Sequence, residues 1–160
     1  MILEKLNHFE KFDFSVNFQI NDEDLEDKYL ELQKKFHPDT ASDQTEAQIN
    51  SILINQAYEI LKKPVKRAIY LLQLQGIDID CDDCLVKPSH ENLIFVMEIR
   101  EEIMENPDNQ NQIKKEIKKT IFDEMPAVID FMSRGDYLNA AQKLIKIKYL
   151  DKIISDLKKK

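Results

Sequence analysis

Glycine and proline are scarce in this chain: its 160 residues include only 2 Gly and 5 Pro, while 33% of the residues are charged. So few turn-forming residues among so many charged ones are typical of a helix-rich protein, and they exclude an all-β or a disordered chain. The length allows one or two domains, with a core large enough to need no stabilising disulfide or metal.

Long apolar runs are also missing, because none approaches the ~18 consecutive apolar residues that a membrane-spanning helix requires. Residues 1–12 mix acids with apolar residues and lack a small-residue cleavage site, so we expect no signal peptide. The 2 Cys fit a compartment that keeps thiols reduced. We therefore expect a cytoplasmic protein with no membrane partner.

Arginine is rare as well: the chain has 3 Arg against 20 Lys, and its net charge is −7. An acidic protein with few Arg side chains for base recognition is a poor general nucleic-acid binder. Gly-rich phosphate loops, nucleophile motifs and clusters with metal-ligand spacing are missing too. We predict no nucleic-acid partner, no enzyme activity, no cofactor and no metal site.

The first half of the chain has the pattern of a helical hairpin. A short apolar stretch at 7–12 and an extended segment at 14–20 precede a helix that Asn21 or Asp22 can cap. Its buried stripe has i, i+4, i+7 and i+11 spacing and consists of Leu25, Tyr29, Leu32 and Phe36. Proline disfavours helical geometry in the residue before it, so Pro38 ends this helix at Phe36 or His37.

The second helix of the hairpin begins after Asp43, which can cap it, and runs for about twenty residues. Pro64 suits the first position of a further helix, and Gly76 suits its C-terminal stop. The turn His37-Pro38-Asp39 therefore lies at the tip of the hairpin, beside Lys34 and Lys35. An imidazole and a carboxylate on a presented turn can contact a partner, although an ordinary helix stop has the same letters.

Residues 77–87 (IDIDCDDCLVK) contain four acids and no helical period, which indicates a linker. Cys81 and Cys84 have the C-x-x-C spacing of half a zinc site or of a redox pair. A structural zinc needs about four ligands, and no second cysteine pair exists. We interpret the two residues as ordinary linker cysteines, with a redox or metal role as the alternative.

The second half of the chain predicts three helices joined by short connections, and hence an antiparallel bundle. The first helix starts after Pro88 and Ser89 and ends near Asn106. The second contains Pro126, which we expect to kink it. Gly135 stops that helix before the third begins.

Five consecutive apolar residues, LIFVM at 93–97, occur in the first of these helices. Successive side chains on a helix rotate by about 100°, so one bundle core cannot bury all five. Val96, Ile99 and Ile103 form one stripe and are expected in the core. Leu93, Ile94 and Met97 then face outward as an apolar patch rimmed by charge, unless they pack on the first unit or on the kink.

Several of these stretches together resemble a known family. Residues 29–39 (YLELQKKFHPD) resemble the second helix and signature turn of a J-domain, and residues 54–61 (INQAYEIL) resemble its third helix. Residues 64–76 follow the pattern PxxRAxYLLxLxG, which resembles the HscB-type co-chaperones of iron–sulfur cluster assembly. Residues 93–105 (LIFVMEIREEIME) resemble the HscB stretch that holds the scaffold protein IscU.

The resemblance implies an all-α protein with an N-terminal J-domain at 1–76, a linker at 77–87 and a three-helix bundle at 88–160. It implies a co-chaperone that stimulates the ATPase of an HscA-type or DnaK-type chaperone and brings it an IscU-like scaffold. The implied chaperone contacts are His37, Pro38, Asp39, Lys34, Lys35 and Lys28. The implied scaffold contacts are Leu93, Ile94, Met97, Glu98, Arg100, Glu101, Glu105 and Tyr149.

Two other hypotheses remain open from the residues. A J-domain could be joined to a bundle that holds a different client, such as an unfolded segment. The chain could instead be a redox or metal protein that uses Cys81 and Cys84.

Overall fold

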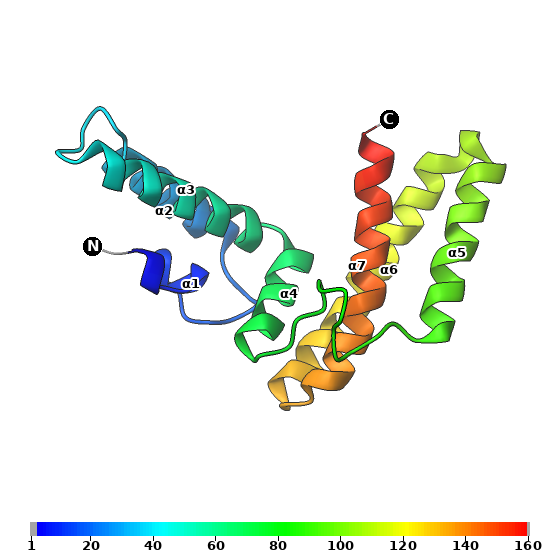
Figure 1. Ribbon diagram of the computed structural model, residues 1–160. Helices are drawn as coiled ribbons and strands as arrows, with labels where there is room; N and C mark the ends of the chain where they lie inside the picture. The colour runs from blue at the N-terminus through cyan, green and yellow to red at the C-terminus, as the bar shows by residue number, and fades with distance from the viewer. Residues whose placement is uncertain (1–2, 160) are drawn as a thin grey trace. The chain divides into compact units, whose positions relative to one another are not determined.

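The computed structural model describes residues 3–159, which form helices and connecting loops without a strand (Figure 1). They divide into two compact units, one ending at Leu71 and the other starting at Leu72. The all-helical prediction is therefore confirmed for the described residues. None of these helices is both long and apolar enough to cross a membrane.

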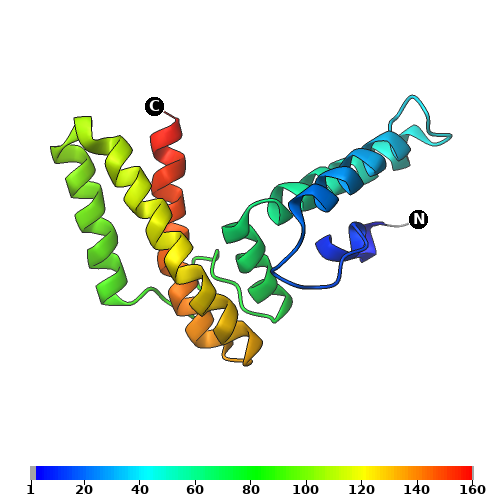
Figure 2. The same ribbon diagram turned by 180° about the vertical axis from the view of Figure 1, so that it is seen from behind.

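The first unit is built on a hairpin of two helices that lie side by side in both views (Figures 1 and 2). The helices before and within it are η1 (Leu3–Lys5), α1 (His8–Lys11), α2 (Asp22–Lys35) and α3 (Gln44–Leu61), and α4 (Pro64–Leu74) follows. Residues 14–20 contain no helix or strand, as the sequence predicts.

Local side chains set where the hairpin helices begin. The Asn21 side chain accepts hydrogen bonds from the amides of Glu23 and Asp24, and Asp43 accepts them from Thr45 and Glu46. These bonds satisfy amides that lack a partner in the first turn of a helix. At the other end of α2, the amide of Phe36 is the last to bond back into the helix, as Pro38 requires.

The core of the first unit joins α1 to the base of the hairpin. Its fully buried members are Leu3, Phe9, Phe12, Leu25, Ile54, Ala57 and Leu61. His8 stacks on Tyr70 with 4.2 Å between ring centroids. Burial, helped by the charge of nearby Lys11, lowers the pKa of His8 to about 4, so the ring is neutral near pH 7.

Arg67 on α4 is only 5% exposed and ties three segments of this unit together. Its guanidinium donates to the carbonyl of Leu61 at 2.7 Å and to the carbonyl of Phe18 at 2.8 Å. It also faces the carboxylate of Asp22 at 3.4 Å. A planar group with five donors can hold an extended segment against two helix ends in this way.

The second unit contains three long helices, α5 (His90–Glu105), α6 (Gln110–Ser133) and α7 (Tyr137–Lys158), with the short η2 (Pro107–Asn109) before α6. All three pack on one another, as the bundle prediction requires (Figure 1). One core cluster is formed by Val96, Ile103, Ile113, Ile117, Leu150, Ile153 and Ile154. Val96 and Ile103 are buried and Ile99 packs against them, which confirms the predicted inward stripe of α5.

Gly76 and Pro126 have different effects on the helices that contain or precede them. Gly76 has a φ of +80° and closes the end of α4, where the amide of Ile77 bonds to the carbonyl of Leu72 at 3.0 Å. Pro126 lies inside α6, which continues through it. Its missing N–H leaves the carbonyl of Phe122 without its usual helical donor, and Phe122 is 78% exposed. Water can therefore serve that carbonyl.

Candidate functional site

The turn after α2 is organised by hydrogen bonds within itself. The amide of Asp39 donates to Nδ1 of His37 at 3.2 Å. The amide and the hydroxyl of Thr40 both donate to the carbonyl of His37, each at 3.0 Å. Because Nδ1 accepts a hydrogen bond, the ring proton of neutral His37 lies on Nε2. The side chains of His37 and Asp39 are 57% and 88% exposed and thus remain open to a partner.

The three lysines predicted beside the turn differ in their surroundings. Lys34 and Lys35 are exposed in the last turn of α2, and the Lys35 ammonium lies 5.5 Å from the centre of the Phe36 ring. Lys28 lies 3.7 Å from the carboxylate of Asp13 and 5.6 Å from the centre of the Phe14 ring. Part of the Lys28 charge is therefore already neutralised by Asp13 within the first unit.

Polar and aromatic side chains join α2 to α3 between the buried base and the turn. The rings of Tyr29 and Tyr58 stack with 4.0 Å between centroids. The Tyr29 hydroxyl and the Gln33 amide both donate to Oδ1 of Asn55, at 2.8 and 2.6 Å. The Tyr58 hydroxyl donates to Glu26, and this bond raises the pKa of Tyr58 to about 12. These contacts fix where the turn is presented.

The outer face of α5 carries the predicted apolar patch. Leu93, Ile94 and Met97 are 39%, 43% and 59% exposed, which confirms their predicted outward orientation. The charged residues predicted around them, Glu98, Arg100, Glu101 and Glu105, are exposed as well. With about 100° between successive residues, Leu93 and Arg100 lie beside the core stripe. The others lie on the side of the helix away from it: Ile94, Met97, Glu98, Glu101 and Glu105.

Met104 also belongs to this face, although the sequence analysis did not assign it. Its side chain is 75% exposed. It follows Met97 by seven residues and Leu93 by eleven, which places all three in one row along α5. The same periodicity predicts this, because Met104 follows Ile103 of the core stripe by one residue and therefore points about 100° away from that stripe. We call Leu93, Ile94, Met97 and Met104 the α5 face.

A hollow of about 390 Å³ borders one side of the α5 face, next to α7. Its lining includes Ile94, Phe95, Glu98 and Lys146. The Lys146 ammonium bonds to Glu124 at 2.7 Å and lies 4.3 Å from the centre of the Phe95 ring. This side of the face therefore combines apolar surface with a neutralised cation.

Tyr149 is the predicted contact that lies farthest from α5 in sequence. It is half-buried on α7 and packs partly against the core cluster of the bundle. It also lines a hollow with Val86 and Pro88. It therefore reaches the surface where α7 meets the segment that leads into α5.

Cys81 and Cys84, which we interpreted as ordinary linker cysteines, are joined to each other by a disulfide. Together with a carboxylate oxygen of Asp78, the two sulfur atoms all lie within 4.8 Å of one another. The segment that carries them packs with the second unit, where Ile79, Cys84 and Val86 are buried.

Two family matches divide the chain as its structure does. The DnaJ domain matches residues 14–70, and the HSCB C-terminal oligomerisation domain matches residues 89–158. The chain is 34% identical to a co-chaperone protein HscB homolog of Neisseria meningitidis serogroup C, with 94% of this chain and 96% of that protein covered. A homolog from Acinetobacter baylyi is also 34% identical, with 96% and 90% covered.

This chain belongs to the HscB family of J-domain co-chaperones. Solved structures of the family share its fold: HscB from Vibrio cholerae superposes with a TM-score of 0.79 at 28% identity, covering 96% of both chains. Human HscB superposes with a TM-score of 0.83 at 28% identity, covering 96% of this chain and 81% of the human one. The J-domain of this HscB-family chain implies an Hsp70-type chaperone as its partner.

Proposed function

We propose that this protein is an adaptor in iron–sulfur cluster assembly that acts in the cytoplasm and has no enzyme activity of its own. The α5 face holds an IscU-like scaffold, and the turn at His37-Pro38-Asp39 engages an HscA-type or DnaK-type chaperone and stimulates its ATPase. The observation that carries the proposal is the exposed α5 face, which lies outside the core of a bundle that matches the HSCB C-terminal domain.

The turn suits contact with an acidic, hydrogen-bonding partner surface. It presents the Nε2 donor of His37 and the carboxylate of Asp39, with Lys34 and Lys35 exposed nearby. Exposed cations beside a fixed turn steer association more than they stabilise the bound complex. The turn acts by favouring one state of the chaperone, and it needs no catalytic base.

The α5 face suits a partner with apolar side chains at its centre and basic groups at its edge. Its apolar row is rimmed by the acids Glu98, Glu101 and Glu105, with Arg100 as the single cation among them. Apolar centres with polar rims are characteristic of protein interfaces. A scaffold that offers an apolar segment flanked by Lys or Arg would complement this pattern.

The turn is tested with His37→Gln in a chaperone ATPase assay. We expect stimulation to fall to the basal rate, because both polar atoms of a Gln amide lie at the end of the side chain. They cannot place an acceptor at the Nδ1 position and a donor at the Nε2 position together. Scaffold affinity should be unchanged. His90→Gln is the matched control, since His90 is an exposed histidine at the start of α5. Survival of stimulation in His37→Gln would overturn the role of the turn.

The α5 face is tested by replacing Leu93, Met97 and Tyr149 together with Ala. Each truncated contact at an interface centre costs about 1–2 kcal/mol, so scaffold affinity should fall by about a hundredfold or more. Chaperone stimulation without scaffold should persist. A matched control truncates three exposed apolar residues elsewhere in the second unit: Leu85, Phe122 and Leu138. Unchanged scaffold binding by the first triple variant would refute the assignment, and binding of unfolded polypeptide instead would indicate a different client.

A further inference from the structure

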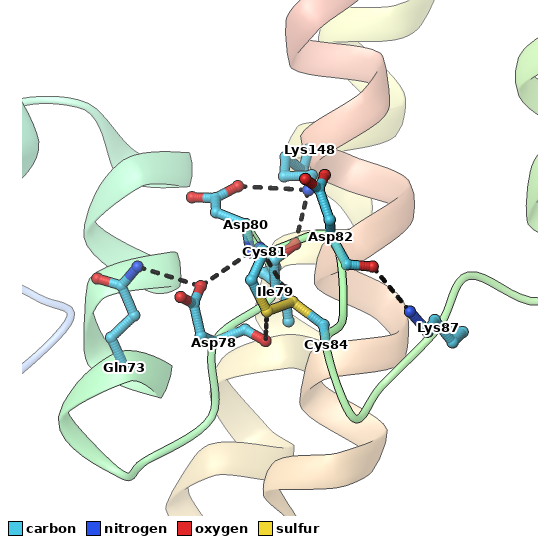
Figure 3. The surroundings of a disulfide bond; sticks show 9 residues. All are labelled: Gln73, Asp78, Ile79, Asp80, Cys81, Asp82, Cys84, Lys87 and Lys148. Atoms are coloured by element: carbon cyan, nitrogen blue, oxygen red, sulfur yellow. Dashed lines mark hydrogen bonds and ion pairs between the residues drawn. A yellow bond between two sulfur atoms is a disulfide. The ribbon is translucent and has the colours of Figure 1, made fainter.

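The segment between α4 and α5 contains a feature that the adaptor role does not use, the Cys81–Cys84 disulfide (Figure 3). The two Cα atoms are 5.2 Å apart, within the range that disulfides occupy. The sequence favours a compartment in which thiols are kept reduced, and disulfides that form there are mostly transient and reversible. The pair therefore needs a chemistry that closes and opens it.

The disulfide lies in a segment that is fastened to α7 by side chains of that helix. The Lys148 ammonium donates to the carbonyl of Ile79 at 2.7 Å and pairs with Asp80 at 3.3 Å (Figure 3). The Gln142 amide donates to the carbonyl of Lys87 at 2.8 Å. The segment is thus held at both ends, and the disulfide closes the turn between them.

The two cysteines differ in accessibility and in hydrogen bonding. Cys81 is exposed, whereas Cys84 is 6% exposed. The amide of Cys81 donates to Sγ of Cys84 at 3.0 Å. A small thiol can therefore reach Cys81, and the sulfur that would leave is the one that already accepts a hydrogen bond. Stabilising the leaving thiolate speeds thiol–disulfide exchange.

We propose that Cys81 and Cys84 form a reversible thiol–disulfide site whose oxidised form fastens residues 78–86 to α7 beside Tyr149. In oxidation, the Cys81 thiolate attacks glutathione disulfide, and one glutathione leaves as a thiol. The Cys84 thiolate then attacks the Cys81 sulfur and releases the second glutathione. The two protein thiols give up two electrons and two protons, which reduce one glutathione disulfide to two glutathione thiols.

The location gives this chemistry a consequence in the second unit. A hollow of about 260 Å³ is lined by Cys81, Cys84, Val86, Lys148 and Tyr149 among others. The turn closed by the disulfide therefore forms one wall of the hollow that Tyr149 also lines. Reduction removes the covalent closure of that wall. The effect on scaffold binding through Tyr149 rests on the proposed function, whereas the redox chemistry does not.

The redox chemistry is tested by equilibrating the full chain in buffers with graded ratios of glutathione to glutathione disulfide. Free thiols are then alkylated and the intact mass is measured. We expect one two-electron transition within the buffered range, seen as the gain or loss of two alkyl groups together. Two thiols that stay reduced in the most oxidising buffer would overturn the proposal. So would a stable glutathione adduct in the unsubstituted chain.

Single variants test the difference between the two cysteines. Cys84→Ser should trap one glutathione on Cys81, because the resolving thiol is gone. Cys81→Ser should gain glutathione at least about tenfold more slowly, since the remaining thiol is buried. Equal rates in the two variants would refute the assigned order of attack.

Hydrogen exchange tests whether oxidation fastens the segment. Amides of residues 78–86 should exchange about tenfold more slowly in the oxidised form, while amides of α5 serve as the internal control. Equal exchange in both forms would overturn the fastening.

Zn²⁺ added to the reduced chain tests the competing interpretation. Stoichiometric binding of Zn²⁺ that blocks disulfide formation would make this a metal site, with Asp78 as the third ligand.

The functional arm compares scaffold affinity of the oxidised chain, the reduced chain and the Cys81→Ser/Cys84→Ser variant. We expect the last two to bind about threefold more weakly than the oxidised chain, a small loss typical of a residue that acts through its support. Equal affinities would overturn the coupling to Tyr149. Failure of every form to bind scaffold would refute the proposed function and leave the redox and exchange arms to decide this one.

Discussion

The turn at His37 and the α5 face, which we propose as the two partner contacts, are built in opposite ways. The turn offers polar and charged groups on a short loop, and its position depends on packing elsewhere in the first unit. The α5 face offers apolar side chains from one continuous helix whose other side is the bundle core. The first kind of contact is sensitive to salt and to remote destabilisation, and the second to local changes of shape and polarity.

Replacing Arg67, which ties three segments of the first unit together, should produce the largest difference in effect between the turn and the α5 face. Arg67→Met leaves the buried carbonyl of Leu61 and the partly buried carbonyl of Phe18 without donors, and each loss costs about 1–3 kcal/mol. We expect the first unit to lose about 2–4 kcal/mol of unfolding free energy. Segment-resolved hydrogen exchange should show faster exchange in α2 and α3 and unchanged exchange in α5–α7. Arg67→Lys is the control that keeps the charge but not the planar fork.

Ionic strength should affect the kinetics of the turn and of the α5 face differently, without any substitution. Raising NaCl from about 0.05 to about 0.5 M shortens the screening length from more than 10 Å to less than 5 Å. We expect chaperone association to slow by about tenfold and scaffold dissociation to change by less than about twofold. Surface-immobilised kinetics with each partner would measure both. Equal salt dependence of the two contacts would break the comparison.

Met104 sharpens the description of the α5 face. Met104→Glu places a charge in the apolar row, and we expect scaffold affinity to fall by about five- to tenfold. Met104→Leu keeps an apolar side chain of similar volume and should bind within about twofold of the unsubstituted chain. Titration calorimetry with the scaffold would decide the matter. An unaffected Met104→Glu variant would limit the face to the residues near Leu93.

The smallest effect is expected among the lysines near the turn. Lys34→Ala removes an exposed cation and should slow chaperone association by about threefold. Lys28→Ala should slow it by less than about twofold, because Asp13 already neutralises part of that charge. Asp13→Asn should then raise the contribution of Lys28. Equal effects of the two lysine variants would contradict this ranking.

The sequence was sufficient to predict features that depend on local rules. Apolar spacing predicts the stripes of α2 and α5, and Pro38 predicts the end of α2. Leu93, Ile94 and Met97 could be assigned to the surface because five apolar residues in a row cannot all face one core. The side chain of Met104 lies on the same face, and only an incomplete use of the same periodicity left it out.

Features that depend on tertiary contacts could not be predicted in the same way. Arg67 appeared only as a letter in a family pattern, and its carbonyl partner Phe18 lies 49 residues away in sequence. The ring of His8 stacks on Tyr70, which lies 62 residues away, and no local pattern predicts that contact. The state of Cys81 and Cys84 depends on how residues 77–87 turn, and that segment has no periodicity to read.

The distribution of burial along the hairpin has one further consequence. Leu25, Ile54, Ala57 and Leu61 are fully enclosed at its base, whereas Phe36 near the tip is only partly covered. Asn50, also toward the tip, is enclosed but leaves its amide nitrogen without a partner. The free energy of local opening should therefore decrease from the base to the tip. A partner that binds the turn would suppress this fraying. Amide hydrogen exchange at the ends of α2 and α3 next to the turn should therefore be slower in the complex.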